Sequence, residues 1–598
     1  MSLIKGLNII FTWTTFLILF EPYHDITESC FYDRQTPNQN VFDKQLTEVW
    51  QSYSRNQRRL KRHSKIVFNP IRISPIYSFD QQLLSEEREA LQNVIERAVR
   101  KINALFSVVS VEGPLLLPRS SCPAIFISGI NKGKCARIPK GYTGEFCMDN
   151  FKIPNTHLQG FVIYNRTSPD PINVYKDGPG LANADFVLYV TSQTTALCNP
   201  YKTSALAYAA SCQLQGEGRP VAGQVNFCPR TVKSQKFDEE LLYKTAVHEL
   251  FHALGFSNKL FDKFQKCNEY GECQAWPQPM LQLSDGVMRL MTDAVIREMK
   301  QHFNCTTRPD FGGPIEITNE KPSSHWDSMF MHSSVMGSKE QKPYQTLIDP
   351  ITLAVFEDSG WYKVNYSHAD TFIWGQDQGC SFGLKGFCES QAGFCIGSHT
   401  GCHHLRLSKA RCNAPDTSTC GVFATDQKPC FISSNNSSSF DEEIFSDSSR
   451  CFLSTLAVAE NVYPEQGMQT QEESGRCYER KCQQDAFFIR VRGGDWILCQ
   501  PGSYVQVPNY EGAVQCPSHQ VICSEFIYPE PSKADVVPSP ITSTNRPAVA
   551  PAPSLSLCSQ AICPQEPEKT GYNAAEVVHR FCSLVLGNIL FTLKLFFS

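Results

Sequence analysis

The sequence predicts an α+β protein: a mixed sheet packed against a long apolar helix, followed by a part that is held together by disulfides. Residues 186–191 are rich in β-branched and aromatic side chains, which favour a strand. Residues 237–254 carry apolar side chains at helical spacing on most sides, which is typical of a buried helix. The 26 cysteines are densest between residues 380 and 523, as in chains that fold in an oxidising compartment.

The chain begins with features of a secreted precursor. Lys5 precedes an apolar run over residues 7–20, which is too short to span a membrane comfortably. We therefore expect a signal peptide over residues 1–20 and a pro-segment over residues 21–65. A strongly basic run over residues 58–62 predicts a processing site for a convertase-like protease, and a solvated basic loop is the alternative.

Residues 66–256 are expected to form the first part of the folded protein. Apolar residues near helical spacing predict a long amphipathic helix over residues 82–105. In the helix over residues 237–254, acidic side chains crowd the first turn, where the helix dipole favours negative charge. Gly255 follows at a position where helices commonly end in a left-handed turn.

The second of these helices carries a candidate metal site. His248 and His252 are four residues apart, so both imidazoles lie on one face of the helix and can reach one Zn²⁺ ion. Glu249 follows His248 directly and projects to the place where a water on the metal would sit. Two incidental histidines on a surface helix would not explain the apolar surroundings. The pattern predicts a zinc site with Glu249 as a general base.

Zinc needs a third protein ligand, and a catalytic site leaves its fourth position to water. The short metzincin pattern has its third histidine six residues after the second, where this chain has Asn258. The third ligand must therefore come from further along the chain. The candidates before the cysteine-rich region are His302, His325, His332 and His368.

Several motifs together resemble leishmanolysin, the surface zinc endopeptidase of trypanosomatids, and its relatives. They are His-Glu-x-x-His-Ala-Leu-Gly-Phe-Ser at residues 248–257, a long insertion, Ser-His-Trp at residues 324–326 and a downstream methionine. The resemblance covers roughly residues 66–525 and includes residues 70–73 as the start of a mature enzyme. It implies a metzincin catalytic domain with one zinc ion per chain, His325 as the third ligand and Met336 in the Met-turn beneath the metal. His332 is the rival third ligand, or an ordinary loop histidine.

The resemblance has further implications for the site. The strand over residues 186–191 would lie at the edge of the cleft, where it could pair with an extended peptide. A cysteine of the pro-segment is thought to silence the family's enzymes by binding the zinc, which makes Cys30 a possible switch. Some metzincins have a tyrosine two residues after the Met-turn methionine. This chain has Ser338 there, so that contribution is absent.

The rest of the folded chain divides into two further parts. Residues 257–365 are expected to form an inserted central subdomain with His325 and Met336, and with helices over residues 284–302 and 350–357. Residues 366–527 are expected to form a cysteine-rich C-terminal domain of loops and strands, because they show little periodicity.

The C-terminus predicts a stalk and a lipid anchor. Residues 528–572 are rich in Pro, Ser and Thr and cannot build a core. Residues 573–598 begin with small residues, continue through a polar spacer and end in an apolar tail, which is the layout of a GPI-attachment signal with Asn573 as the attachment residue. A membrane span is the alternative. Glycosylation sequons compatible with secretion start at Asn165, Asn304, Asn365, Asn435 and Asn436.

The net charge of −4 gives no electrostatic argument for nucleic-acid binding. The expected function is zinc-dependent cleavage of extended polypeptides at the extracellular face of the plasma membrane, by an enzyme made as a secreted proenzyme. A surface adhesin that keeps the fold without the activity is the alternative. Degenerate copies usually lose the glutamate or a histidine first, and here Glu249 and all three histidines are present.

Overall fold

The computed structural model describes residues 67–524, apart from residues 80–82, 120–121, 200–204, 217, 234–236, 269–271, 340, 385–392, 415–419, 426–428, 434–441 and 459–472. The expected signal peptide, the pro-segment with Cys30, the stalk and the tail with Asn573 lie outside the described residues. No helix within the described ranges combines the length and the apolar character that crossing a membrane requires.

A four-stranded sheet forms the first part of the fold. Its strands, in spatial order, are β2 (Ile73–Phe79), β8 (Phe186–Ser192), β10 (Pro220–Phe227) and β9 (Ala207–Leu214). The first three run parallel, and β9 is antiparallel to β10. Every residue of β8 and β10 is buried, as expected for strands that are covered on both faces.

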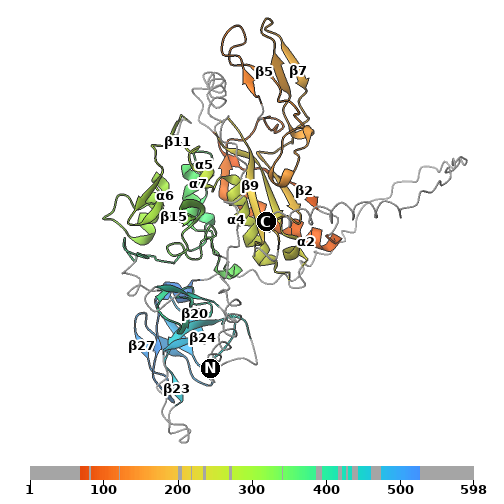
Figure 1. Cartoon of the computed structure of the whole chain (residues 1–598). Helices are drawn as coiled ribbons and strands as arrows, with labels where there is room; N and C mark the ends of the chain where they lie inside the picture. The colour runs from red at the N-terminus through yellow and green to blue at the C-terminus, as the bar shows by residue number, and fades with distance from the viewer. Residues whose placement is uncertain are drawn as a thin grey trace, which may run out of the picture. The chain divides into compact units, whose positions relative to one another are not determined.

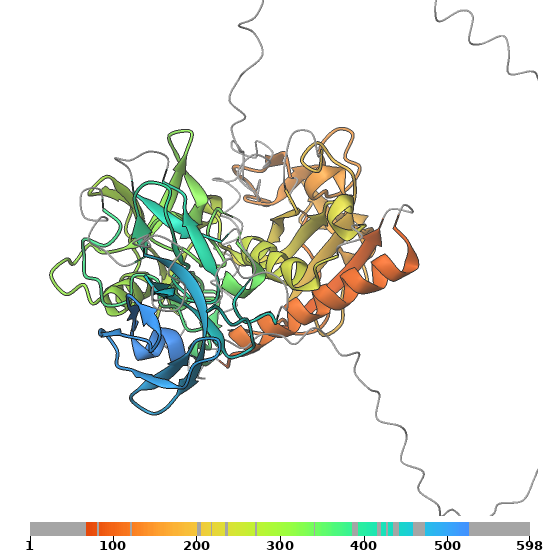
Figure 2. The ribbon, with the colours of Figure 1, turned by 90° about the horizontal axis from the view of Figure 1, so that it is seen from below.

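Two long helices cover one face of this sheet: α2 (Ser85–Leu105) and α4 (Glu239–Leu254). The two helices contact each other, and α4 also contacts β9 and β10 (Figures 1 and 2). Leu188 of β8 packs into the core on this face, whereas Val187 and Tyr189 pack on the opposite face. The sequence-predicted helices over residues 82–105 and 237–254 and the strand over residues 186–191 are therefore confirmed.

The expected position of the strand over residues 186–191 is wrong. β8 pairs with β2 on one side and with β10 on the other, so it lies inside the sheet. The strand at the edge on the α4 side is β9. The composition of residues 186–191 predicts a strand but carries no information on strand order, which here depends on β2 pairing from more than 100 residues earlier in the chain.

A buried ion pair fixes the start of β8. The Asp185 carboxylate is fully buried and accepts hydrogen bonds from Arg72 Nε (2.9 Å), Arg72 Nη2 (2.8 Å) and the Val111 amide (2.7 Å). The Arg72 amide donates a further bond of 3.0 Å. Both oxygens of this buried carboxylate therefore accept hydrogen bonds, as a buried charge requires. The contact joins the segment that leads into β2 to the strand beside it.

Smaller elements surround the sheet. β1 (Asn69–Pro70), β3 (Phe106–Val108) and β17 (Lys363–Val364) form a three-stranded sheet, and α3 (Pro229–Val232) follows β10. Two hairpins and two 3₁₀ turns lie between α2 and β8: β4 (Ala124–Ile125) with β5 (Cys135–Arg137), β6 (Phe161–Tyr164) with β7 (Pro171–Tyr175), η2 (Met148–Asn150) and η3 (Asn155–His157). Three disulfides hold this region: Cys122–Cys135, Cys147–Cys212 and Cys198–Cys228.

The central part contains a second antiparallel sheet. Its strands are β13 (Leu281–Ser284), β14 (Val287–Leu290), β15 (Gly313–Thr318) and β16 (Lys321–Trp326). The expected helix over residues 284–302 is only partly confirmed, because α6 spans Asp293–Phe303. Asp285 and Gly286 have φ angles of 52° and 75° and form the tight turn between β13 and β14. Asp-Gly between apolar residues is a strong hairpin signal, and it excludes a helix that begins at residue 284.

The remaining central elements are short. They are α5 (Asn258–Phe261), β11 (Gln265–Cys267), β12 (Cys273–Ala275), η4 (Pro343–Gln345), α7 (Pro350–Asp358) and η5 (Tyr366–His368). The helix expected over residues 350–357 is confirmed as α7. Pro350 occupies its first turn, and Asp349 caps it by accepting a bond of 2.7 Å from the Thr352 amide.

The C-terminal part consists of short strands and disulfides, as the sequence predicts. β18 (Phe394–Cys395), β21 (Gly421–Ala424), β20 (Lys409–Cys412) and β19 (Thr400–Cys402) form one sheet. A six-stranded sheet contains β26 (Ile497–Cys499), β25 (Phe487–Arg490), β24 (Ser474–Cys482), β22 (Ser449–Ser454), β29 (Val514–Gln515) and β27 (Tyr504–Val505). β23 (Ala457–Val458) pairs with β28 (Tyr510–Glu511), and α8 (His519–Cys523) ends the described chain. Disulfides here include Cys395–Cys412, Cys402–Cys451, Cys430–Cys477, Cys482–Cys523 and Cys499–Cys516.

Candidate metal centre

Three imidazole rings from two distant segments meet at one point. His248 and His252 come from α4, and His325 comes from β16. The Nε2 atom of His252 lies 3.1 Å from that of His248 and 3.2 Å from that of His325. His252 and His325 are buried, and His248 is half-buried, so the cluster is open to solvent only on the His248 side.

The local sequence explains why α4 presents its histidines here. The Asp238 side chain caps the helix by accepting a bond of 3.0 Å from the Leu241 amide. Gly255 ends the helix with a positive φ of 148°. At the contact with β10, a side chain at Gly223 would bring its Cβ to 2.9 Å from the Cβ of Ala253, so only glycine lets the helix lie this close to the sheet.

The contacts of the Nδ1 atoms determine which nitrogen carries the proton in the two α4 histidines. His248 Nδ1 lies 2.5 Å from the Val335 carbonyl oxygen, and His252 Nδ1 lies 2.8 Å from the Phe256 carbonyl oxygen. A carbonyl can only accept, so both Nδ1 atoms carry the proton and both Nε2 atoms present a lone pair. Lone pairs about 3 Å apart repel one another unless a cation lies between them, and this is the arrangement that a metal ion stabilises.

Burial keeps all three rings neutral. It lowers the pKa of His325 to about 4, and together with the neighbouring His325 it lowers the pKa of His248 to about 3. Burial and the two adjacent rings hold the pKa of His252 well below its usual range. Neutral imidazole is the form that binds a metal, so at neutral pH no ring has to release a proton first.

Asn258 holds the third histidine in place, although it occupies the position where the short motif has a histidine. Its amide donates to Ser324 Oγ (3.1 Å), and its side chain donates to the Pro322 carbonyl oxygen (2.7 Å). Both acceptors belong to β16, the strand that carries His325. The residue after the α4 turn therefore anchors the strand that supplies the third ring.

The loop with Met336 lies against both parts of the cluster. Val335 binds His248 as described, and the Met336 carbonyl oxygen accepts a bond of 2.9 Å from the amide of Trp326, next to His325. The Met336 side chain is fully buried. Ser334 Oγ donates to Asp349 Oδ2 (2.6 Å), so the cap of α7 also fixes this loop. A sequence motif marks the methionine, whereas these carbonyl and hydroxyl contacts carry no sequence signal.

Glu249 lines a small pocket beside the cluster. Its side chain is 1% exposed. The pocket has a volume of about 60 Å³ and is also lined by His248, Thr245, Leu206 and Val335. Leu206 directly precedes the edge strand β9, so the pocket opens between that strand and the Met336 loop. A carboxylate in this position can exchange a proton with a molecule held in front of the three rings.

The other sequence candidates lie elsewhere. His332 belongs to a different group of histidines, with His403 and His404, and is not part of the cluster around His252. The Ser338 hydroxyl donates to Glu316 Oε1 (2.6 Å) and also contacts Ser328 Oγ. The second histidine group was not predicted, although His403 and His404 stand as a pair directly after Cys402 in the sequence.

The chain is similar in sequence to known metallopeptidases. The family model for leishmanolysin matches residues 167–421 and 417–528. The "Ciliated left-right organizer metallopeptidase" of Danio rerio is 34% identical over 528 residues, which cover 84% of this chain and 83% of that protein. The protein of the same name from Mus musculus is 35% identical over 456 residues, covering 72% of this chain and 64% of that protein.

A "Leishmanolysin-like peptidase" of Drosophila melanogaster is 28% identical over 374 residues, covering 54% of this chain and 52% of that protein. The family implies a metal cofactor, and the three imidazoles that meet at His252 provide nitrogen donors for one. The chain belongs to the leishmanolysin family and is a metalloprotease.

Proposed function

We propose that this metalloprotease is a zinc-dependent endopeptidase with His248, His252 and His325 as metal ligands. The observation that carries the proposal is the spacing of the three Nε2 atoms. A tetrahedral zinc ion with bonds of about 2.0–2.1 Å sets its ligand nitrogens about 3.3 Å apart. The distances of 3.1 and 3.2 Å from His252 Nε2 to the other two Nε2 atoms lie close to this value.

The chain's own groups supply the proton transfers. When bound, zinc supplies Lewis-acid polarisation of the scissile carbonyl and makes a water molecule more acidic. Glu249 takes the proton from the attacking water and delivers it to the nitrogen of the leaving amine. The Val335 and Phe256 carbonyls keep the α4 rings in the tautomer that points Nε2 at the reaction centre. Met336 forms an apolar floor in the loop below the rings.

The substrate is an extended polypeptide. β9 ends the sheet, so its second edge offers backbone groups to which a peptide can add as a further antiparallel strand. The pocket at Leu206, Thr245 and Val335 then receives a side chain next to the scissile bond. Its volume of about 60 Å³ favours a small side chain, so we expect cleavage beside residues such as Ala, Ser or Val.

The cellular setting is a further part of the proposal. Many disulfides fit an extracellular protein, and leishmanolysin relatives are typically surface proteases. We propose that the enzyme is made as a secreted proenzyme, that Cys30 of the pro-segment silences it and that a GPI anchor at Asn573 holds it on the cell surface. An adhesin without activity is the alternative from another functional class.

One experiment separates the two functions. The full chain is expressed in a secretory eukaryotic cell, and its zinc content, its cleavage of casein and its N-terminal sequence are measured. The enzyme hypothesis predicts bound zinc, a new N-terminus near residue 66 and cleavage that a chelator abolishes. A silent adhesin would show no such cleavage. Release of the protein by a phosphatidylinositol-specific phospholipase tests the anchor, and retention after this treatment contradicts it.

A further inference from the structure

A second group of three histidines is buried outside the proposed catalytic centre. His332 follows β16 in the central part, and His403 and His404 follow β19 in the C-terminal part. One nitrogen from each residue lies within 4.8 Å of the others. His332 is 7% and His403 is 1% exposed, and His404 is half-buried. Three imidazoles rarely gather in a protein interior without partners that satisfy their nitrogens.

We propose that His332, His403 and His404 bind a second divalent transition-metal ion, which joins the Met336 loop to the cysteine-rich part of the chain. Imidazole nitrogens suit ions such as Zn²⁺, Cu²⁺ and Ni²⁺. A tetrahedral zinc ion sets its nitrogens about 3.3 Å apart. From separations of 4.8 Å or less, each ring of a pair moves inward by less than about 1 Å to reach this spacing.

Polar side chains hold two of the rings in place. Ser333 Oγ lies 3.2 Å from His404 Nε2, and Gln341 Nε2 donates a bond of 3.2 Å to His332 Nδ1. Ser333 Oγ and Gln341 are also hydrogen-bonded to each other (3.0 Å). Because Ser333 Oγ has given its own proton to Gln341, it accepts the proton of His404 Nε2, which leaves His404 Nδ1 with a lone pair.

Backbone geometry on both sides presents the rings rigidly. Ser333 is a non-glycine residue with a positive φ of 72°, a costly conformation that persists only when surrounding contacts enforce it. It lies between His332 and Ser334, the residue that binds Asp349, so one short loop serves both histidine groups. On the other side, the Cys402–Cys451 disulfide and a tight turn with Arg406 at φ 56° hold the pair His403 and His404.

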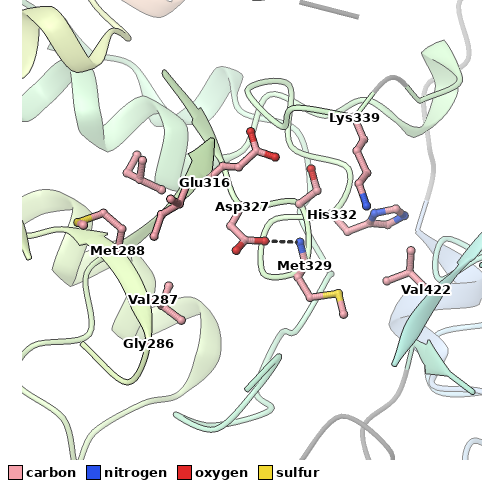
Figure 3. Close-up of a pocket in the computed structure, with 12 residues that line it drawn as sticks. Gly286, Val287, Met288, Glu316, Asp327, Met329, His332, Lys339 and Val422 are labelled. Carbon is pink, nitrogen blue, oxygen red and sulfur yellow. Dashed lines mark hydrogen bonds between the residues drawn. The ribbon is translucent and has the colours of Figure 1, made fainter. Parts of the chain in front are cut away.

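A cavity of about 250 Å³ lies next to His332 and offers a route for the ion and room for a water ligand (Figure 3). Glu316 and Asp327 line the same cavity as His332 and Lys339. The Lys339 ammonium points at His332 and opposes a cation there, so this exposed side chain has to turn toward solvent when the ion binds. Trp374 packs against His332 and His404 with ring centroids 5.1 and 4.9 Å away and shields the group from the other side.

Metal counting on the secreted full chain tests this proposal. Zinc, copper and nickel per chain are measured by mass spectrometry in the wild type, in His252→Gln and in the double variant His403→Gln/His404→Gln. His399→Gln is the matched control, because His399 is an exposed histidine of the same region. We expect two metal ions in the wild type and in the control, and one in each of the other two proteins.

The result that overturns the proposal is one ion in the wild type that is lost completely in His252→Gln. An ion that survives His252→Gln but disappears in the double variant would support the second site and contradict the catalytic one. If the double variant is not secreted, His404→Gln is measured instead, because its partly exposed ring tolerates a polar replacement. The number of metal ions per wild-type chain distinguishes one site from two without any variant.

Discussion

His248 Nδ1 lies 2.5 Å from the carbonyl oxygen of Val335, the residue that precedes Met336. This contact ties the zinc-binding helix to a loop that is more than 80 residues away in sequence. The loop in turn depends on Asp349, which caps α7 and accepts the Ser334 hydroxyl. The orientation of a proposed metal ligand therefore depends on a residue that touches neither the metal nor the substrate.

Replacing Asp349 by Ala should destabilise the protein and slow catalysis. The substitution removes the cap of α7 and leaves the buried hydroxyls of Ser334 and Thr352 without their acceptor. We expect a loss of about 2–4 kcal/mol in the free energy of unfolding, measured by urea titration. Asp238→Ala, which removes the exposed cap of α4, should cost only about 1 kcal/mol. Equal losses for the two variants would contradict the role given to Asp349.

Asn258→Ala should weaken metal binding without removing a ligand. The variant loses the side-chain bond to Pro322 that anchors β16 near His325. Losing a contact that positions a metal ligand typically reduces metal affinity about 10–100-fold. Competition with a zinc-binding dye measures this affinity directly. Asn268→Ala, at an exposed position directly after β11, serves as the control and should leave it unchanged. An unchanged metal affinity in Asn258→Ala would contradict the role of Asn258 in positioning His325.

The Arg72–Asp185 pair should make stability fall in acid. Burial alone would raise the pKa of Asp185, but hydrogen bonds from Arg72 and the Val111 amide outweigh it and lower this pKa below its ordinary value. A carboxyl group with a depressed folded pKa contributes stability above its unfolded pKa of about 3.9 and loses that contribution as pH falls through the folded value.

Asp185→Asn tests this dependence. At pH 7 the variant should be less stable than the wild type by about 1–3 kcal/mol, because its buried amide NH2 group faces donors and Arg72 loses its counter-charge. The difference should shrink as pH falls below about 4, where Asp185 of the unfolded wild type takes up a proton, and the charge contribution should be lost once pH passes the lower folded pKa. Unfolding curves from pH 7 to pH 3 measure it. A difference that stays constant over this range would exclude the pair as its source.

Much of the site is encoded locally and was therefore predictable. His248, Glu249 and His252 share one helical turn, and residues 242–254 show the apolar pattern of a buried helix. His325 was selected from four downstream histidines only by resemblance to a family. Spacing alone does not predict that β16 reaches α4, because that contact depends on Asn258 and on the order of strands in a second sheet.

Features that depend on long-range pairing could not be predicted from the sequence. The composition of residues 186–191 fits a central strand and an edge strand equally well. Only the pairing with β2 and β10 decides between the two positions. The second histidine group forms from residues that are about 70 positions apart, so it has no motif. In contrast, the turn at Asp285 and Gly286 depends on local sequence, so the Asp-Gly pair could have predicted it.

The most direct test of the central claim is peptide cleavage by Glu249→Gln, with metal content measured on the same protein. The substitution keeps the size of the side chain and all three histidines but removes the proton acceptor. We predict an unchanged metal content in the His252 cluster and at least about a 100-fold loss of cleavage, with Glu239→Gln on the exposed start of α4 as the active control. Cleavage at the wild-type rate by Glu249→Gln would contradict the account.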